Sequence, residues 1–322
     1  MALRENASAH GPASAAAVAA NQLRQRAKTQ VRHAMTVDVE DYFQVSAFES
    51  AIDRADWDGF KRRVDVNTHR LLDLFDEVQI KATFFVLGWV AEREPQLIKD
   101  IAARGHEIAC HGFSHRLVYT QTRTEFHEET ARSKRILEDL VQRPIAGYRA
   151  ASYSITNDSL WALDVLAELG FEYDSSIFPV HHDRYGIPGA PQHIHRVLSG
   201  ARSNLIEFPL SSLTLLGQNV PVAGGGYFRF YPYALTRWLL NQVADASERP
   251  FVFYLHPWEV DPDQPRVPNL AARSRFRHYL NLNRCLPRLR LLLQDFAFGP
   301  MADAIRDVHD GDVNQLPTHR YL

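Results

Sequence analysis

Residues 105–115 read GHEIACHGFSH, and this stretch joins a strand to a pair of histidines. Gly105 marks a turn, and the apolar residues after it predict a short buried strand that ends at Cys110. His111 and His115 are four residues apart, so on one helical turn both imidazoles would share a face and reach one metal ion. Histidine is frequent in this chain, with 15 copies, so such a pair also arises by chance. The rest of the chain decides between these two interpretations.

Strands and helices alternate on both sides of this stretch. The apolar runs predict strands at 34–39, 82–87, 106–110 and 145–149, and amphipathic patterns predict helices at 57–77, 94–105, 124–141 and 157–169. The nearly continuous apolar run at 82–87 is typical of a strand covered on both faces. This order predicts an α/β fold with a parallel sheet or barrel.

The second half of the chain is less regular. Its pattern predicts strands at 205–210 and 251–256, a glycine-rich turn at 224–226, a helix at 234–245 and a basic helical region beyond 270. Residues 186–200 are expected to form a long surface connection. Residues 1–32 lack aromatic side chains and are expected to be a disordered tail, because they cannot bury enough apolar surface.

Composition excludes several classes of protein. A formal charge of -2 indicates neither a nucleic-acid partner nor binding to an anionic membrane. The two cysteines, Cys110 and Cys285, cannot form a disulfide framework, which favours a reducing compartment. Without an apolar run of about 18 residues or a convincing signal core, we expect a soluble, cytoplasmic protein with no stable membrane insertion. The oligomeric state is not predicted.

Side chains that can act in catalysis or bind a metal follow four of the expected strands. The acids Asp38, Glu40 and Asp41 come after the first, the two histidines after the third, and Arg149 and His256 after later ones. Carboxylates this close repel one another unless a cation or an arginine neutralises them. In a repeated strand–helix order these groups would converge at one rim of a barrel.

These motifs, in this order, resemble a known family. With the segments TVDVEDYF (36–43) and YLHPWE (254–259), the chain is similar to the polysaccharide deacetylases with NodB homology, and within them to a subfamily associated with exopolysaccharide and exosortase loci. The resemblance implies a distorted (β/α) barrel with a C-terminal helical and irregular extension. It divides the chain into the tail, the first part of the barrel at 33–194, and a C-terminal region at 195–322 that includes the last barrel strand with His256.

The resemblance also implies a metal site. Asp38 matches the general base, and His111 and His115 match two ligands. The third ligand stays open between Glu40 and Asp41, and strand alternation favours Glu40 because it points to the same side as Asp38. Two histidines and a carboxylate suit Zn²⁺ by default, and Co²⁺, Ni²⁺ or Fe²⁺ also suit them.

The remaining motifs carry further expected roles. Arg149 would orient Asp38 and keep it ionised, although the proline that usually follows this arginine is missing. His256 would be the general acid, tuned by the acid of the segment Tyr173–Ser175. The candidates for substrate binding are Tyr153, Arg229 and Trp258, the last as a stacking surface for a sugar ring.

Together these features predict a metal-dependent hydrolase that removes N-acetyl groups from amino sugars of a polysaccharide or its precursor, in exopolysaccharide biosynthesis. Its partner would be a glycan with N-acetylated sugars. Two alternatives stay open: hydrolysis of another C–N bond, as in a cyclic amide or formamide, on the same fold, and a non-catalytic glycan-binding barrel.

Overall fold

A mostly parallel sheet organises the chain. The computed structural model describes residues 31–198, 205–247, 249–308 and 312–321, and all but the last two residues of the expected tail lie outside these ranges. The strands are β1 (His33–Val39), β2 (Thr83–Val86), β3 (Glu107–Cys110), β4 (Gly147–Tyr148), β5 (Tyr173–Asp174), β6 (His195–Val197), β7 (Ile206–Glu207), β10 (Val252–Leu255), β11 (Phe298–Gly299) and β12 (Thr318–His319).

The strand order places β1 and β10, which hold the first and last of the predicted motifs, beside each other. The ten-stranded sheet runs β10-β1-β2-β3-β4-β5-β7-β6-β12, with β11 also paired to β1. Neighbouring strands from β10 to β7 are parallel. The pair β7–β6 is antiparallel, and β12 is parallel to β6. A small hairpin of β8 (Ser212–Leu215) and β9 (Gln218–Pro221) stands apart from it. The α/β fold predicted from the sequence is confirmed.

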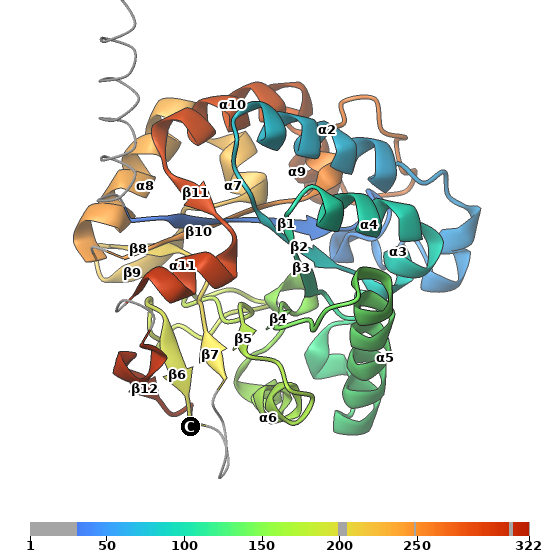
Figure 1. Ribbon diagram of the computed structural model, residues 1–322. Coiled ribbons are helices and arrows are strands. Elements are labelled where there is room, and N and C mark those ends of the chain that lie inside the picture. Colours follow the sequence, from blue (N-terminus) through green and yellow to red (C-terminus); the bar gives the residue numbers. More distant parts are fainter. Residues whose placement is uncertain (1–30, 199–204, 248, 309–311, 322) are drawn as a thin grey trace, which may run out of the picture. The chain divides into compact units, whose positions relative to one another are not determined.

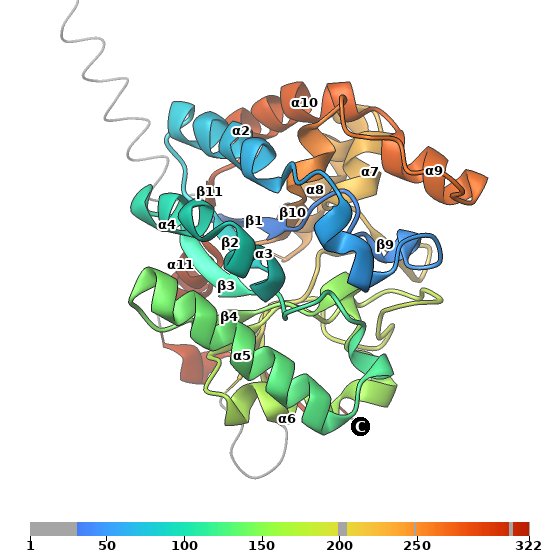
Figure 2. The ribbon, with the colours of Figure 1, turned by 90° about the vertical axis from the view of Figure 1, so that its right-hand side faces the viewer.

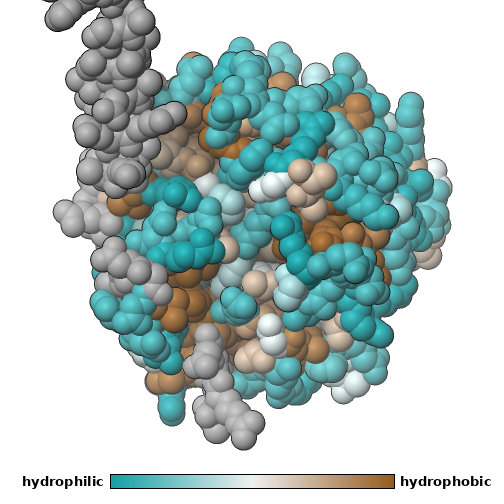
Figure 3. Space-filling view, viewed as in Figure 1, coloured by the Kyte–Doolittle hydropathy of each residue, from teal (hydrophilic) through white to brown (hydrophobic). Residues whose placement is uncertain are grey.

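Helices surround the strands (Figure 1, Figure 2). They are α2 (Val64–Glu77), α3 (Gly88–Arg93), α4 (Pro95–Ala103), α5 (Arg123–Val141), α6 (Trp161–Glu168), α7 (Gly225–Phe230), α8 (Tyr233–Ser247), α9 (Ala272–Tyr279), α10 (Leu282–Asp295) and α11 (Met301–Asp307). In the direction of view of Figure 1, the surface is mainly hydrophilic with scattered hydrophobic patches (Figure 3), as expected of amphipathic helices.

The pleat of the strands separates two apolar layers. Met35 and Val37 of β1 belong to the layer that packs under the helices, whereas Ala34, together with Phe85 of β2 and Ala109 of β3, belongs to a second cluster. Since side chains alternate along a strand, Thr36 and Asp38 lie on the same side as Ala34. This second side carries both an apolar cluster and the polar groups described below.

Helix α11 covers the amino edge of the sheet. Its first backbone N–H groups donate to the residues that begin two strands: Met301 to Thr83 Oγ1 at 2.7 Å and Ala302 to Glu107 Oε2 at 3.2 Å. Met301 is fully buried in the second apolar cluster. The carboxyl edge, where the strands deliver the candidate residues, is therefore the edge available for a site.

Some local predictions were wrong. The helix expected from residue 57 begins at Val64, and residues Arg54–Gly59 form a 3-10 helix instead. The start of α2 depends on a distant side chain, because Asp41 Oδ2 accepts the backbone N–H groups of Arg63 and Val64. The turn expected at 224–226 is also corrected, since α7 begins at Gly225.

We expect the buried His33 to make the fold sensitive to acid. Its ring stacks on Phe251 with centroids 3.7 Å apart, and burial lowers its pKa from 6.5 to about 3. The unfolded chain therefore binds this proton first, so stability is lost as pH falls from 6.5 toward 3, by at most about 1.4 kcal/mol per pH unit.

Urea unfolding at pH 7 and pH 5 tests this. The variant His33→Asn keeps an acceptor for the Phe251 N–H but cannot titrate, so it should lose less stability between these pH values than the parent protein. The exposed His127→Asn is the matched control and should behave like the parent. An equal loss in all three proteins would contradict the prediction.

Candidate active site

Asp38 lies at the centre of the carboxyl edge. It is 1% exposed, and its Oδ1 accepts from Arg149 NH1 at 2.7 Å. Its Oδ2 lies 3.4 Å from the hydroxyl of Tyr153, which donates to it, and 3.9 Å from His256 Nε2. One carboxylate oxygen is thus occupied by a guanidinium, and the other faces the remaining candidate groups.

Arg149 is fully buried and held by two neighbouring segments. Its Nε donates to the backbone oxygen of Ser175 at 3.1 Å and its NH2 to the hydroxyl of Ser175 at 3.0 Å. The guanidinium also lies over the ring of Phe85, 4.1 Å from its centroid, and NH1 donates to Thr36 Oγ1. These contacts fix the orientation of the cation that faces Asp38.

Three ligand-type side chains converge beside Asp38. One ligand atom from each of Glu40, His111 and His115 lies within 4.8 Å of the other two, and all three residues are buried. His115 Nε2 is 2.8 Å from Glu40 Oε2, and the two imidazole centroids are 5.5 Å apart. The structure therefore brings both predicted histidines together with the preferred carboxylate.

The two histidines do not share a helical turn as expected. Residues 111–117 form a loop in which Gly112 has a φ of +73° and His115 a φ of +53°. The backbone oxygens of Gly112 and Phe113 accept from Gly88 and Trp89 at the start of α3, which pins the loop. The histidines converge because this anchored loop turns back, rather than through helical periodicity.

Each imidazole has one nitrogen engaged in a hydrogen bond away from the cluster. His111 Nδ1 is 2.8 Å from the backbone oxygen of Arg149, and His115 Nδ1 is 3.4 Å from Ser46 Oγ. This arrangement leaves the two Nε2 atoms directed at the cluster, as second contacts do around metal-binding histidines. Burial lowers the pKa of His111 to about 4, which keeps its ring neutral at pH 7.

Glu40 carries a buried oxygen without a hydrogen-bond donor. Its Oε1 accepts from Trp258 Nε1 at 3.2 Å, whereas Oε2 has no hydrogen bond of acceptable geometry within the described ranges, although His115 Nε2 is close. Burial would raise the pKa of this carboxyl, but the charges of His115 and His256 outweigh burial and lower it. An ionised, buried oxygen with an open position fits a cation.

Asp41 lies outside this cluster. Its carboxylate accepts from the backbone N–H groups of Tyr42, Arg63 and Val64 at 2.8, 2.6 and 2.9 Å. Burial raises the pKa of Asp41 to about 6 despite these hydrogen bonds. Because Asp41 stands one position after Glu40, its side chain leaves on the other side of the chain and caps α2 instead.

His256 completes the group because β10 pairs in parallel with β1. Its Nε2 is 3.5 Å from Glu40 Oε1, and its Nδ1 is 2.8 Å from Glu259 Oε1. Burial opposes protonation of the ring, yet Glu40, Glu259 and Asp38 outweigh burial and raise its pKa to about 9. The side chain remains 18% exposed, so it can meet a bound molecule.

Glu259 is a site residue that the sequence reasoning missed. It is fully buried between His256 and Arg229, whose Nε donates to Glu259 Oε2 at 2.6 Å. The Arg229 charge outweighs burial and, with His256, lowers the pKa of Glu259 to about 2. A signal was present: Glu259 stands three residues after His256 and accepts its backbone N–H, the spacing of a capping box.

This position of Glu259 corrects the expectation for Asp174. Asp174 hydrogen-bonds with Ser176 and Glu207, and within the described ranges no hydrogen bond or ion pair joins it to His256. Instead, its neighbour Ser175 holds Arg149. The segment Tyr173–Ser175 thus acts on the arginine, and Glu259 is the acid that contacts the histidine.

The three substrate-binding candidates are more buried than expected. Tyr153, Arg229 and Trp258 are 7%, 2% and 5% exposed. The Trp258 ring stacks on His256 and on His278, with ring centroids 5.2 and 4.2 Å away, and the Arg229 guanidinium also lies over it. Arg229 donates to Glu259 and to the backbone oxygens of His278 and Leu280. These contacts position neighbouring groups rather than offer open surfaces.

Two family models and several known proteins match parts of this chain. A family model described as polysaccharide deacetylase matches residues 57–173, and one described as a domain of unknown function matches residues 175–306. A peptidoglycan deacetylase from Helicobacter pylori is 30% identical over 119 residues, which are 37% of this chain and 39% of that protein. A chitooligosaccharide deacetylase from Bradyrhizobium is 31% identical over 100 residues, 31% of this chain and 43% of that protein. The chain thus spans about two fifths of these relatives.

A solved structure supports the fold over most of the chain. A candidate polysaccharide deacetylase from Mycobacterium smegmatis aligns with a TM-score of 0.59 and 20% identity, covering 90% of this chain and 94% of that one. In the described part of the chain, no helix is both long and apolar enough to cross a membrane. Residues 57–173 are therefore similar in sequence to polysaccharide deacetylases, and the solved structure supports the fold over most of the chain.

Proposed function

We propose that this protein is a metal-dependent hydrolase that removes N-acetyl groups from amino sugars. One observation carries the proposal: Asp38, His256 and the group of Glu40, His111 and His115 meet at one edge of the sheet. This set combines a base, an acid and three ligands, which hydrolysis of an amide needs. The similarity to peptidoglycan and chitooligosaccharide deacetylases supports an N-acetylated glycan as substrate.

The cluster fits a divalent cation. Two imidazole nitrogens and a carboxylate form a three-ligand site that leaves positions for water and substrate, and Zn²⁺ is our first choice, with Co²⁺, Ni²⁺ or Fe²⁺ as alternatives. The cation supplies Lewis acidity, which acidifies water and polarises the acetyl carbonyl. Glu40 Oε2, the buried oxygen without a donor, is the observation in favour of this fit.

Asp38 is the general base in this proposal. As water attacks the acetyl carbon, Asp38 Oδ2 takes its proton, because Oδ1 is held by Arg149. The guanidinium holds the carboxylate in one orientation. The tetrahedral oxyanion then collapses by breaking the C–N bond, which requires a proton on the leaving nitrogen.

His256 supplies that proton. The surrounding carboxylates keep the ring protonated at neutral pH, and Nε2 faces the cluster while Nδ1 donates to Glu259. Transfer of the Nε2 proton to nitrogen releases a free amine on the sugar and acetate. We propose that the glycan belongs to exopolysaccharide biosynthesis, on the resemblance of the sequence motifs alone.

Acetate release tests the proposed function. The full-length protein loaded with Zn²⁺ should release acetate from N-acetylated sugars, and His111→Ala and Asp38→Ala should abolish release. Bound metal is measured in parallel and should be about one per chain in the parent protein. Unchanged acetate release in both variants would contradict the assignment. Metal binding without release from any N-acetylated sugar would favour hydrolysis of another kind of C–N bond.

We expect Glu259→Gln to lower kcat about tenfold or more without changing KM. Glutamine keeps the shape and one acceptor but removes the charge that holds His256 protonated and oriented, so the acid step weakens while substrate binding does not. Steady-state kinetics of acetate release measure this. The control is Glu92→Gln, which removes an exposed carboxylate that pairs with Arg132 and Arg93. A rise of KM alone would contradict a positioning role for Glu259.

A further inference from the structure

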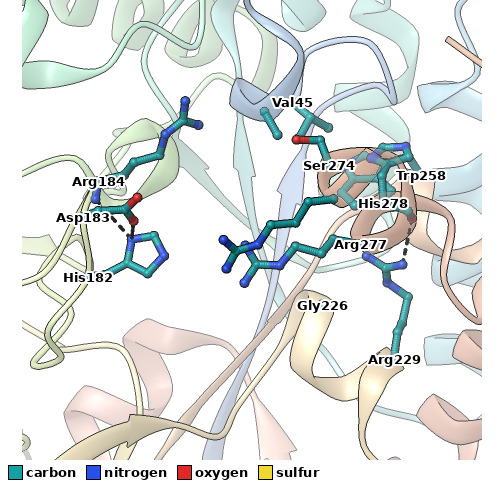
Figure 4. A pocket seen from close by; sticks show the side chains of 12 residues that line it. Val45, His182, Asp183, Arg184, Gly226, Arg229, Trp258, Ser274, Arg277 and His278 are labelled. Carbon is teal, nitrogen blue, oxygen red and sulfur yellow. Dashed lines mark hydrogen bonds and ion pairs between the residues drawn. The ribbon is translucent and has the colours of Figure 1, made fainter. Parts of the chain in front are cut away.

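A cavity adjoins the candidate active site on its open side. Its volume is about 320 Å³, and Val45, Ala47, His182 and Trp258 are among the residues that line it. Figure 4 shows Arg277 extending into it between the His182–Arg184 segment on one side and Trp258 with His278 on the other. This volume lies within the range of small-molecule sites.

Three independent contacts tie this cavity to the active site. Trp258 lines it and also donates to Glu40. Val45 and Ala47 line it, and Ser46 between them contacts His115. His182 lines it and stacks on Tyr185, whose ring lies 6.0 Å from that of Tyr153, the neighbour of Asp38. A molecule held in the cavity would therefore lie beside the reacting groups.

Positive charge dominates the lining. Arg184, Arg273 and Arg277 are exposed, and within the described ranges no hydrogen bond or ion pair joins their guanidinium groups to a carboxylate. The acid in the lining, Asp183, lies 2.9 Å from His182. Arg273 and Arg277 are four residues apart on α9, so they share one helical face. Arg229, which also lines the cavity, differs because it pairs with Glu259.

A second, more aromatic cavity continues from the first. It has a volume of about 330 Å³, shares Arg273 and Arg277 with it, and is lined further by Tyr227, Phe230 and Phe276. Phe230 and Phe276 are 59% and 58% exposed. Beyond the arginines, the surface is thus suited to a flat or apolar group.

We propose that the arginine-lined cavity binds the diphosphate of an activated, N-acetylated sugar, so that the substrate is a glycosyl diphosphate rather than a neutral glycan. The inference rests on the proposed function. A single carboxylate is satisfied by one bidentate arginine, whereas three unpaired arginines suit a group with several anionic oxygens and more than one negative charge. The aromatic cavity then receives the carrier that follows the diphosphate, which is either a lipid chain or a nucleoside.

Binding is tested first, with uridine diphosphate N-acetylglucosamine as the probe. The metal-loaded Asp38→Asn protein binds without turnover, and calorimetric titration should show binding that weakens as salt concentration rises. Adding Arg273→Ala and Arg277→Ala should weaken it about 10- to 100-fold. Adding Arg275→Ala, which removes one positive charge from α9 outside this cavity, should leave it unchanged. Equal affinity in the double-arginine variant would overturn the inference.

Turnover then identifies the carrier. Acetate release by the parent protein is compared among the nucleotide sugar, a polyprenyl diphosphate N-acetylglucosamine in detergent and neutral N-acetylchitotriose. A higher kcat/KM for either diphosphate, lost in Arg273→Ala/Arg277→Ala but not in Arg275→Ala, supports the inference and names the source. Equal kcat/KM for the neutral sugar overturns it. No release from any of the three contradicts the proposed function instead, while the titration still decides whether the cavity binds diphosphate.

Discussion

Replacing Asp38 with asparagine is expected to lower the rate of acetate release roughly a thousandfold while bound metal is retained. Asparagine has nearly the same shape, and its side-chain oxygen can still accept from Arg149 NH1, but the amide cannot take a proton from water. The loss should fall on kcat, since proton transfer contributes in the transition state and little in substrate binding. Acetate release and metal content, measured on the same preparation, check this.

Two controls separate the base from its surroundings. Tyr153→Phe removes the hydroxyl that lies 3.4 Å from Asp38 Oδ2 and should change the rate less than tenfold. Thermal unfolding of Asp38→Asn should show lower stability, because Arg149 keeps its burial but loses its counter-charge. If Asp38→Asn retained a tenth or more of the parent rate with metal bound, another group would be the base.

Glu40→Gln and Asp41→Asn are expected to have opposite effects on metal and on stability. Glu40 faces the two histidines, so its glutamine variant should bind Zn²⁺ far more weakly, beyond the roughly 10- to 100-fold loss typical of changes outside the ligand sphere. Asp41 caps α2 through the backbone N–H groups of Arg63 and Val64. Its asparagine variant should keep the metal and lose about 1 kcal/mol of stability.

The pair is a matched test because the two residues are adjacent and each substitution removes one negative charge. Metal content after dialysis and the free energy of unfolding are measured for both variants. Loss of metal in Asp41→Asn, with retention in Glu40→Gln, would reverse the assignment of the third ligand. Loss in both would indicate that the Asp41 cap positions the Glu40 segment.

Much of the fold follows from local patterns in the chain. The apolar runs around Val37, Phe85 and Ala109 predict the parallel strands, because buried strands need continuous apolar faces. The boundary of α2 was missed since Asp41, more than 20 residues earlier, caps its first turn. Local sequence does not contain that contact.

In the candidate site, too, local sequence predicts some features and the tertiary structure decides others. Strand alternation predicted that Glu40, rather than Asp41, faces the side of Asp38; in the structure Glu40 lies with the two histidines, whereas Asp41 accepts from the start of α2. The helical turn predicted for His111 and His115 is wrong, because the loop that carries them is anchored to α3 by backbone hydrogen bonds. The pair converges all the same, since both ends of this loop are fixed.

By itself the sequence determined which residue types stand at the ends of the strands and, through the period of two, which of them share a side. The family resemblance implied the pair of Arg149 and Asp38, whereas the tertiary structure alone decided the other partners of the buried charges, such as Arg229 for Glu259. Arg229 is 30 residues from Glu259, and Arg149 is 111 residues from Asp38, yet both pairs are buried ion pairs. Since burial penalises an unpaired charge and a parallel sheet brings distant strand ends to one edge, these partners are set by folding and not by proximity along the chain.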